Sequence, residues 1–207
     1  FPVLFGGGSF NTVFVSNNGN LNFTGPFSAY ANTSIPNSQI ENLVAPLWDD
    51  LFSTPGTSQN VFWAVIGTAP NRELVVEWRD VRHFSCTTDS LATVRFQVVF
   101  FEGQSDILFN YDDTVFGGGC SFADQGASAT VGVQRGLNTG TQFSFNENSL
   151  SNNTSLLWTL ASEQPPAISV TPSSQDFGSV NVGGSAERDF TVQNTGAGTL
   201  SGSATTS

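Results

Sequence analysis

The feature that most constrains the fold is a segment, residues 92–101, in which apolar and polar side chains alternate. The apolar series occupies every second position: Val94, Phe96, Val98 and Phe100. Residues spaced by two share one face of a β-strand, whereas a helix would distribute them around its axis. The same spacing recurs in residues 73–81 and 107–111. The sequence therefore predicts several strands that each present one apolar face.

Further segments rich in β-branched and aromatic residues predict more strands, and turns rich in Gly, Asn and Ser separate them. These segments are 10–15, 21–24, 43–48, 61–66, 129–134, 141–145 and 155–160. Segment 61–66 is apolar on both faces, so we expect it at the centre of a sheet. One short helical turn is expected near 38–42. One-sided strands bury their apolar faces when two sheets pack together, which predicts an all-β, two-sheet β-sandwich.

A change of composition near residue 164 divides the chain. We predict a β-sandwich domain over 1–163, a Pro-rich linker over 164–167 and a separate β segment over 168–207, because consecutive prolines stiffen a chain and remove strand donors. The last segment holds about three predicted strands. An immunoglobulin-like sandwich needs about seven strands and about 100 residues. The tail is therefore predicted to be an incomplete immunoglobulin-like β segment.

The charge balance excludes some classes of partner. The chain has 6 basic and 17 acidic residues, a formal net charge of −11. Binding to nucleic acid through a basic surface is not expected, and neither is attraction to an anionic membrane surface. No apolar run approaches the roughly 20 residues of a membrane helix, so membrane insertion is not expected. Because the chain starts at Phe1 and shows no signal peptide, we interpret it as a processed product or a fragment.

The two cysteines, Cys86 and Cys120, allow a single pairing. A bond between them would close a loop of about 35 residues and stabilise the fold by roughly 3–4 kcal/mol. Two free, buried thiols are the alternative. A disulfide, with a polar composition that lacks Lys, predicts a secreted protein located outside the cell or on its surface.

His83 is the only histidine, and it follows a predicted strand. A serine or cysteine nucleophile would need it as the base, yet no G-x-S-x-G motif is present. One His and two Cys cannot supply a tetrahedral zinc site. We therefore expect a histidine on the surface or in a loop, and a protein that is not an enzyme.

Two pairs of adjacent acids follow predicted strands: Asp49 with Asp50, and Asp112 with Asp113. Such carboxylates could hold Ca²⁺, which prefers hard oxygen ligands. Alternatively, these acids cap turns and remain solvated. Calcium is the only cofactor that the sequence suggests.

Aromatic side chains have two expected roles. Trp63, Trp78 and Trp158 lie within predicted strands, so we expect them in the core. Tyr30 lies in the polar loop 28–34 and is the better candidate for stacking against a glycan.

Residues 5–160 resemble the nidogen-like (NIDO) extracellular domain. The matching motifs are VFVSNNGNLNF (13–23), VAPLWDDL (44–51), LVVEW (74–78), FQVVFFE (96–102), DILFNY (106–111) and ATVGVQ (129–134). The resemblance implies a β-rich module of adhesive, matrix and bacterial surface proteins, with no enzymatic activity and no agreed ligand.

Residues 167–207 resemble the first strands of the hydin-type (choice-of-anchor) immunoglobulin-like repeat of bacterial surface proteins. The matching residues are Ile168–Pro172, Asp176–Gly178, Val182–Gly183 and Asn194–Gly196. The match stops before the second half of that repeat. This resemblance implies that a partial sandwich ends the sequence.

An incomplete sandwich leaves strand edges that recruit other strands. Either the protein continues past Ser207, or the tail pairs with the next subunit. The residues expected to insert are Ile168, Val170, Phe177, Phe190 and Val192.

The predicted function is therefore a non-enzymatic secreted or cell-surface structural or adhesive protein, such as a filament subunit joined to its neighbour by C-terminal strand donation. The alternative is a calcium- or glycan-binding adhesion module within a larger surface protein. The expected partners are further copies of the chain, other surface proteins or glycans.

Overall fold

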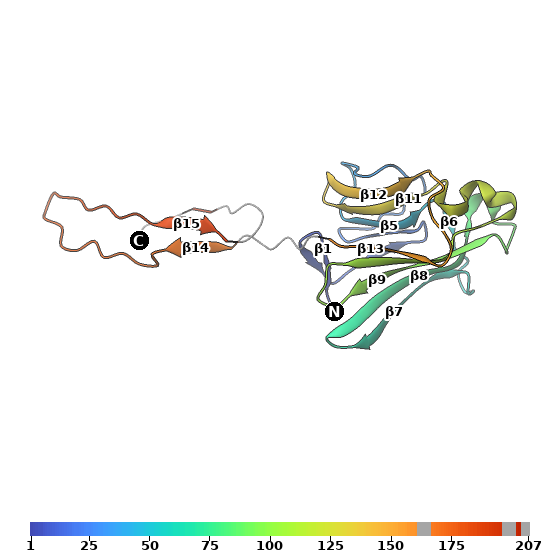
Figure 1. Cartoon of the computed structure of the whole chain (residues 1–207), viewed down its shortest axis with the longest axis horizontal. Helices are drawn as coiled ribbons and strands as arrows, with labels where there is room; N and C mark the ends of the chain where they lie inside the picture. Colours follow the sequence, from blue (N-terminus) through green and yellow to red (C-terminus); the bar gives the residue numbers. More distant parts are fainter. Residues whose placement is uncertain (161–166, 196–201, 204–207) are drawn as a thin grey trace. The chain divides into compact units, whose positions relative to one another are not determined.

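The computed structural model describes residues 1–160, 167–195 and 202–203 (Figure 1). The chain forms two compact units, Phe1–Ala161 and Ser162–Ser207. Of the predicted linker 164–167, all but Ala167 lies outside the described residues. Antiparallel strands dominate, which confirms the all-β class.

Two main sheets build the first unit, which confirms the predicted sandwich. One sheet has the order β13-β10-β9-β8-β6, and β7 also pairs with β8. Its strands are β6 (Leu51–Phe52), β7 (Asn60–Thr68), β8 (Asn71–His83), β9 (Thr93–Phe101), β10 (Ile107–Asp113) and β13 (Thr154–Trp158). The other has the order β12-β11-β5-β4-β3. Its strands are β3 (Phe14–Ser16), β4 (Asn20–Asn22), β5 (Leu43–Trp48), β11 (Thr130–Arg135) and β12 (Thr139–Phe145). A separate hairpin joins β1 (Val3–Phe5) to β2 (Gly8–Phe10).

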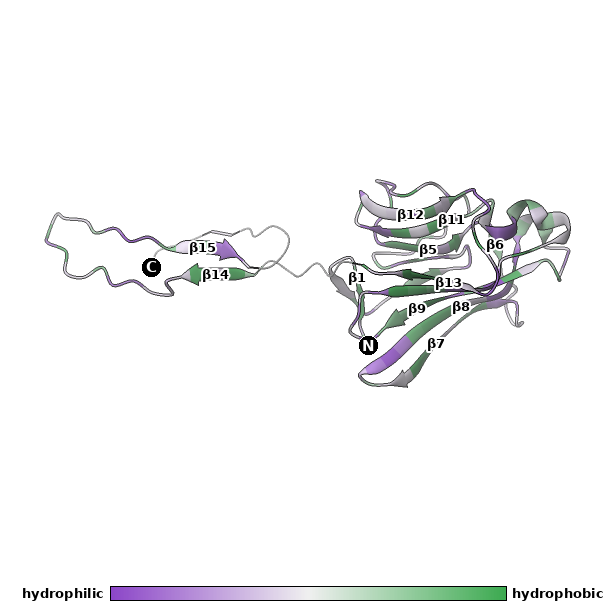
Figure 2. Cartoon of the chain, viewed as in Figure 1, coloured by the Kyte–Doolittle hydropathy of each residue, from purple (hydrophilic) through white to green (hydrophobic). Residues whose placement is uncertain are grey.

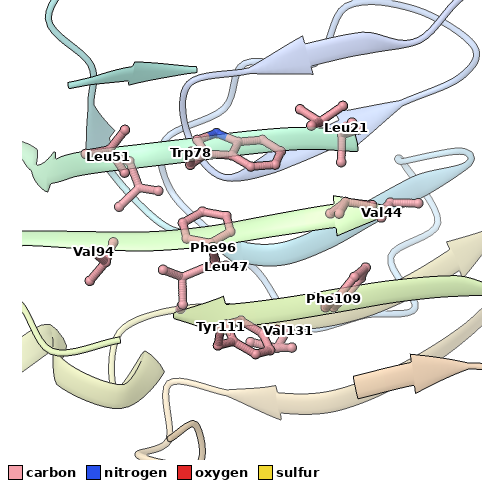
Figure 3. Close-up of a cluster of buried hydrophobic side chains, with 14 of the residues drawn as sticks. Leu21, Val44, Leu47, Leu51, Trp78, Val94, Phe96, Phe109, Tyr111 and Val131 are labelled. Atoms are coloured by element: carbon pink, nitrogen blue, oxygen red, sulfur yellow. The ribbon is translucent and has the colours of Figure 1, made fainter. Parts of the chain in front are cut away.

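The core lies between the two sheets (Figure 3). The alternation in β9 is confirmed, because each residue of its apolar series is at most 1% exposed. Trp78 of β8 stacks on Phe96 of β9, with ring centroids 4.9 Å apart. Leu21, Val44 and Val131 of the opposite sheet belong to the same buried cluster. Apolar residues at every second position of β9 therefore all face the core between the two sheets.

Local predictions differ from the structure at three places. The expected strand 10–15 is divided, because β2 ends at Phe10 and β3 begins at Phe14. The short turn expected near 38–42 forms, with the Ile40 backbone N–H donating to the Asn37 carbonyl, but two 3₁₀ helices that were not expected also form, η1 (Phe84–Cys86) and η2 (Gly118–Gly126). The central position expected for 61–66 is wrong, because β7 lies at a sheet edge and pairs only with β8 among the described residues.

The described part of the second unit contains two strands rather than the three expected. They are β14 (Ile168–Thr171) and β15 (Thr191–Asn194), which pair antiparallel. Figure 2 shows that β14 is hydrophobic in composition, whereas β15 is mixed. In the described residues, no helix combines the length and the apolar character that crossing a membrane requires.

Candidate functional site

The inner face of strand β7 is apolar and uncovered. Three of its residues lie opposite core-facing residues of β8, in the pairs Val61↔Trp78, Trp63↔Val76 and Val65↔Leu74. Directly opposite residues of an antiparallel pair project from the same face of the sheet. Yet Trp63 is 70% exposed and Val65 is 46% exposed, whereas Trp78 is fully buried. The prediction that Trp63 belongs to the core is therefore wrong.

The cause is that the opposite sheet does not reach β7. That sheet ends at β3, which has three residues against nine in β7. Val15 of β3 also faces inward, opposite the buried Leu21, and is 41% exposed. A groove of about 490 Å³ opens between the two edges, with a lining that includes Phe1, Phe10, Val13, Val15, Trp63 and Leu74. A second hollow of about 270 Å³ shares Val15, Trp63 and Val76 with it.

The backbone edge of β7 is also unprotected. Asn60–Thr68 contains no charged residue and no Pro, the residue types that proteins use to block edge-to-edge pairing. On the outer face, the guanidinium of Arg79 lies 4.6 Å from the centre of the Phe62 ring. The inner face has no comparable cover, so β7 offers a free strand edge beside an apolar groove.

The tail strands present a second uncovered apolar face. Val170 of β14 lies opposite Val192 of β15, and Ile168 lies opposite Asn194, so the three apolar residues share one face. They are 63% (Ile168), 40% (Val170) and 59% (Val192) exposed. The other face carries only polar side chains: Ser169, Thr171, Thr191 and Gln193. Phe177 and Phe190 are also exposed, but they lie outside the two strands.

His83 is buried, so the expected surface or loop histidine is wrong. It ends β8 on the same inward side as Val81, and it is only 5% exposed. Its Nδ1 accepts a hydrogen bond from the Ser85 backbone N–H, and its Nε2 lies 3.5 Å from Oδ1 of Asp49. Rings of Phe116 and Phe122 meet its imidazole edge-on.

The Ser128 hydroxyl donates to Oδ2 of Asp49 over 2.5 Å. The carboxylate therefore lies between serine and histidine, whereas a nucleophile needs the histidine in the middle. This cluster joins β5, β8 and the loop before β11, and its polar groups satisfy one another inside the fold.

Three of the four acids considered for calcium, Asp49, Asp112 and Asp113, have protein partners. Asp49 also accepts the backbone N–H of Asp50, and burial raises the pKa of Asp50. Asp112 lies 3.3 Å from Arg95. Asp113 accepts the Val115 backbone N–H and the Asn152 amide. Among the described residues, no three His, Cys, Asp or Glu side chains gather to hold a metal ion.

The aromatic residues divide as follows. Trp78 is fully buried, and its indole N–H donates to the Ser16 carbonyl. Trp158 is half-buried against Phe109. Tyr30 is 65% exposed, as expected, and its role in glycan stacking stays a prediction.

The predicted disulfide between Cys86 and Cys120 is confirmed. The two 3₁₀ helices η1 and η2 carry the cysteines, with Cα atoms 6.1 Å apart. Both residues are buried, so the alternative of two free thiols is wrong.

A protein-family model described as NIDO-related matches residues 1–176. The chain belongs to the NIDO-related family. This membership supports the nidogen-like resemblance and identifies an extracellular type of module. The NIDO-related match covers the whole sandwich and reaches past β14, whereas the hydin-type resemblance of the tail stays a prediction. No curated protein and no solved structure matches the chain.

Proposed function

We propose that this NIDO-related chain is a non-enzymatic structural or adhesive protein of the cell exterior, and that its copies join into filaments through their C-terminal strands. The observation that carries this proposal is the uncovered apolar face of the β14–β15 hairpin, formed by Ile168, Val170 and Val192. Isolated two-stranded hairpins are marginally stable in water. Covering this face removes apolar surface from water, which favours association by about 25 cal/mol per Å².

The hairpin has the composition of a strand donor. One face is apolar and the other is polar, so a neighbouring sheet that accepts it gains both backbone hydrogen bonds and apolar contact. We propose further that residues 167–207 are the opening strands of a hydin-type repeat, which a neighbouring chain completes. A tail that binds a different surface of the next copy makes a head-to-tail link, and such links grow into filaments unless the rotation closes a ring.

The buried polar cluster favours a structural role over a catalytic one. The His83 imidazole is enclosed by Phe116 and Phe122, and Ser128 donates its hydroxyl to Asp49. These contacts hold the two sheets together near the disulfide and leave the imidazole inaccessible to a substrate.

Removal of the tail tests the proposal. We expect the full chain to form filaments that are visible by electron microscopy and sediment as large species. Residues 1–163 contain the whole sandwich core and should remain a folded monomer, with a β-type circular dichroism spectrum and a cooperative melting transition. Polymerisation of this shortened chain, or a full chain that stays monomeric, would overturn the proposal.

Two neighbouring positions of β14 provide a matched pair. Val170→Asp places a charge on the apolar face and should prevent assembly. Ser169→Asp adds the same charge on the polar face and should leave assembly intact. Equal effects of the two substitutions would show that the apolar face is not the contact.

A further inference from the structure

Strand donation, which this inference takes from the proposed function, requires an acceptor surface on the sandwich. We propose that the acceptor is the free edge of β7 with the groove beside it, and that its occupant is the β14–β15 hairpin of a second copy. The hairpin would extend the sheet beyond β7. Its apolar face would then lie beside Trp63 and Val65, over the groove.

The edge of β7 suits an added strand better than the edges of β12 and β13 do. It is nine residues long, against seven in β12 and five in β13. All three lack charge and Pro, but the inward side chains of β13, Leu156 and Trp158, already pack against the core. Strand β7 instead leaves Trp63 and Val65 uncovered. It therefore combines a backbone to pair with and an apolar face to cover.

The groove explains why an added strand would gain more here than backbone hydrogen bonds. Inward-facing residues of both sheets, Val15 and Trp63, border a space of about 490 Å³. Side chains from an added strand would fill the opening that the short β3 leaves. Large aromatic residues at the centre of such contacts carry much of the binding energy.

The charge distribution is compatible with a second copy as the occupant, because the strands that would meet are uncharged. Each chain carries a net charge of −11, so two copies repel one another over most orientations. Asn60–Thr68, Ile168–Thr171 and Thr191–Asn194 contain no charged residue. Joining donor and acceptor through these strands brings no like charges into direct contact.

The donor and acceptor are different surfaces of the same chain. Each copy can therefore donate its hairpin to one neighbour and accept a hairpin from another. This arrangement is heterologous and predicts a linear filament with one β7 edge occupied at each joint.

Photo-cross-linking of the full chain tests the acceptor. Trp63 is replaced by p-benzoylphenylalanine, and ¹⁵N-labelled copies are mixed with unlabelled copies before irradiation. Mass spectrometry should find cross-links from position 63 to residues 167–195 of a chain with the other isotope label. The same replacement of Leu157 is the matched control, because this residue is 61% exposed on β13 of the same sheet. It should give few cross-links to the tail.

Substitution provides a second measurement. Trp63→Asp should raise the protein concentration needed for assembly about tenfold or more, whereas Leu157→Asp should leave it nearly unchanged. Both side chains are exposed, so both variants should keep the melting temperature of the unmodified chain at concentrations below those of assembly. A folded Trp63→Asp variant that assembles normally would overturn the acceptor.

The outcomes separate the two proposals. Filaments whose tail cross-links to Leu157, or to any surface other than β7, would overturn the β7 acceptor and leave strand donation standing. Cross-links from position 63 confined to one isotope label would show pairing within a chain and overturn exchange between copies. A full chain that stays monomeric at every concentration would overturn both.

Discussion

At the scale of single residues, Tyr111 illustrates how the core accommodates a polar atom. Its ring is 1% exposed, and its hydroxyl donates to the Pro46 carbonyl of the opposite sheet over 2.7 Å. Burial raises the pKa of Tyr111 well above its usual 10, so the hydroxyl remains protonated and able to donate. This hydrogen bond joins β10 to β5 across the sandwich.

Removal of that hydroxyl should destabilise the fold. Tyr111→Phe leaves the Pro46 carbonyl without its partner inside the core, which should lower the free energy of unfolding by about 1–3 kcal/mol. Urea denaturation measures the change. Tyr30→Phe is the control, since its ring is 65% exposed and should show no change. Equal stability of both variants would mean that the carbonyl finds another donor.

The ion pair between Arg72 and Glu102 predicts a pH dependence. The hydrogen bond from the guanidinium lowers the pKa of Glu102 from its ordinary 4.5 to about 2. A carboxyl whose pKa is lower in the folded than in the unfolded state stabilises the fold at any pH above its unfolded-state pKa. This contribution is lost as the pH falls towards the folded-state pKa. Stability should therefore fall between pH 4.5 and about 2.

Denaturation measured across that pH range tests the assignment. Glu102→Gln cannot titrate, so its stability should change less steeply there than that of the unmodified chain. Parallel curves for the two proteins would assign the acid sensitivity to other carboxyls.

At the scale of elements, the turn between β3 and β4 depends on Gly19. Its φ of +71° lies in the left-handed region, and a Cβ there would lie 1.8 Å from the Leu47 carbonyl oxygen. That close approach lets the Gly19 carbonyl accept the Leu47 backbone N–H. The turn thereby attaches the β3–β4 hairpin to the end of β5.

Gly19→Ala should cost at least about 2 kcal/mol of stability, because backbone strain and a backbone clash add. Thermal and urea denaturation measure the loss. Gly25→Ala is the matched control, since an added Cβ there has nothing within 4 Å. A small effect at Gly19 would show that the turn can move away from β5 at little cost.

A β-bulge in β8 determines where the element directs its side chains. The register with β9 shifts between Trp78 and Val81, and Asp80 has a φ of +51°. Both Trp78 and Val81 are fully buried although their spacing is three. The bulge restores the inward series, which then continues to His83. A strict alternation carried through residue 80 would have directed His83 outward.

At the scale of the whole molecule, net charge should control assembly. Copies with a charge of −11 repel one another, and the proposed contact strands are uncharged. Salt screens the repulsion without weakening the apolar contact. The protein concentration needed for assembly should therefore decrease as NaCl is raised from about 0.02 M to about 0.5 M. Sedimentation velocity at several salt concentrations measures this. Dissociation by added salt would indicate ion pairs across the contact instead.

Side-chain spacing by itself determined the all-β class, the two-sheet core and the apolar face of β9, because a period of two specifies which residues share a face. Because the chain has only two cysteines, the sequence also determined that any disulfide within the chain joins Cys86 to Cys120. Tail residues such as Val170 were also recognisable as apolar positions of a strand.

Only the tertiary structure decided what covers each face. Segment 61–66 is as apolar as a central strand, yet β7 lies at an edge of its sheet, and the short β3 of the opposite sheet leaves its inner face uncovered. The burial of His83 likewise depends on the bulge at Asp80 and on Asp49, which follows β5. Strand order and the extent of the opposite sheet depend on contacts distant in sequence, and local periodicity carries no information about them.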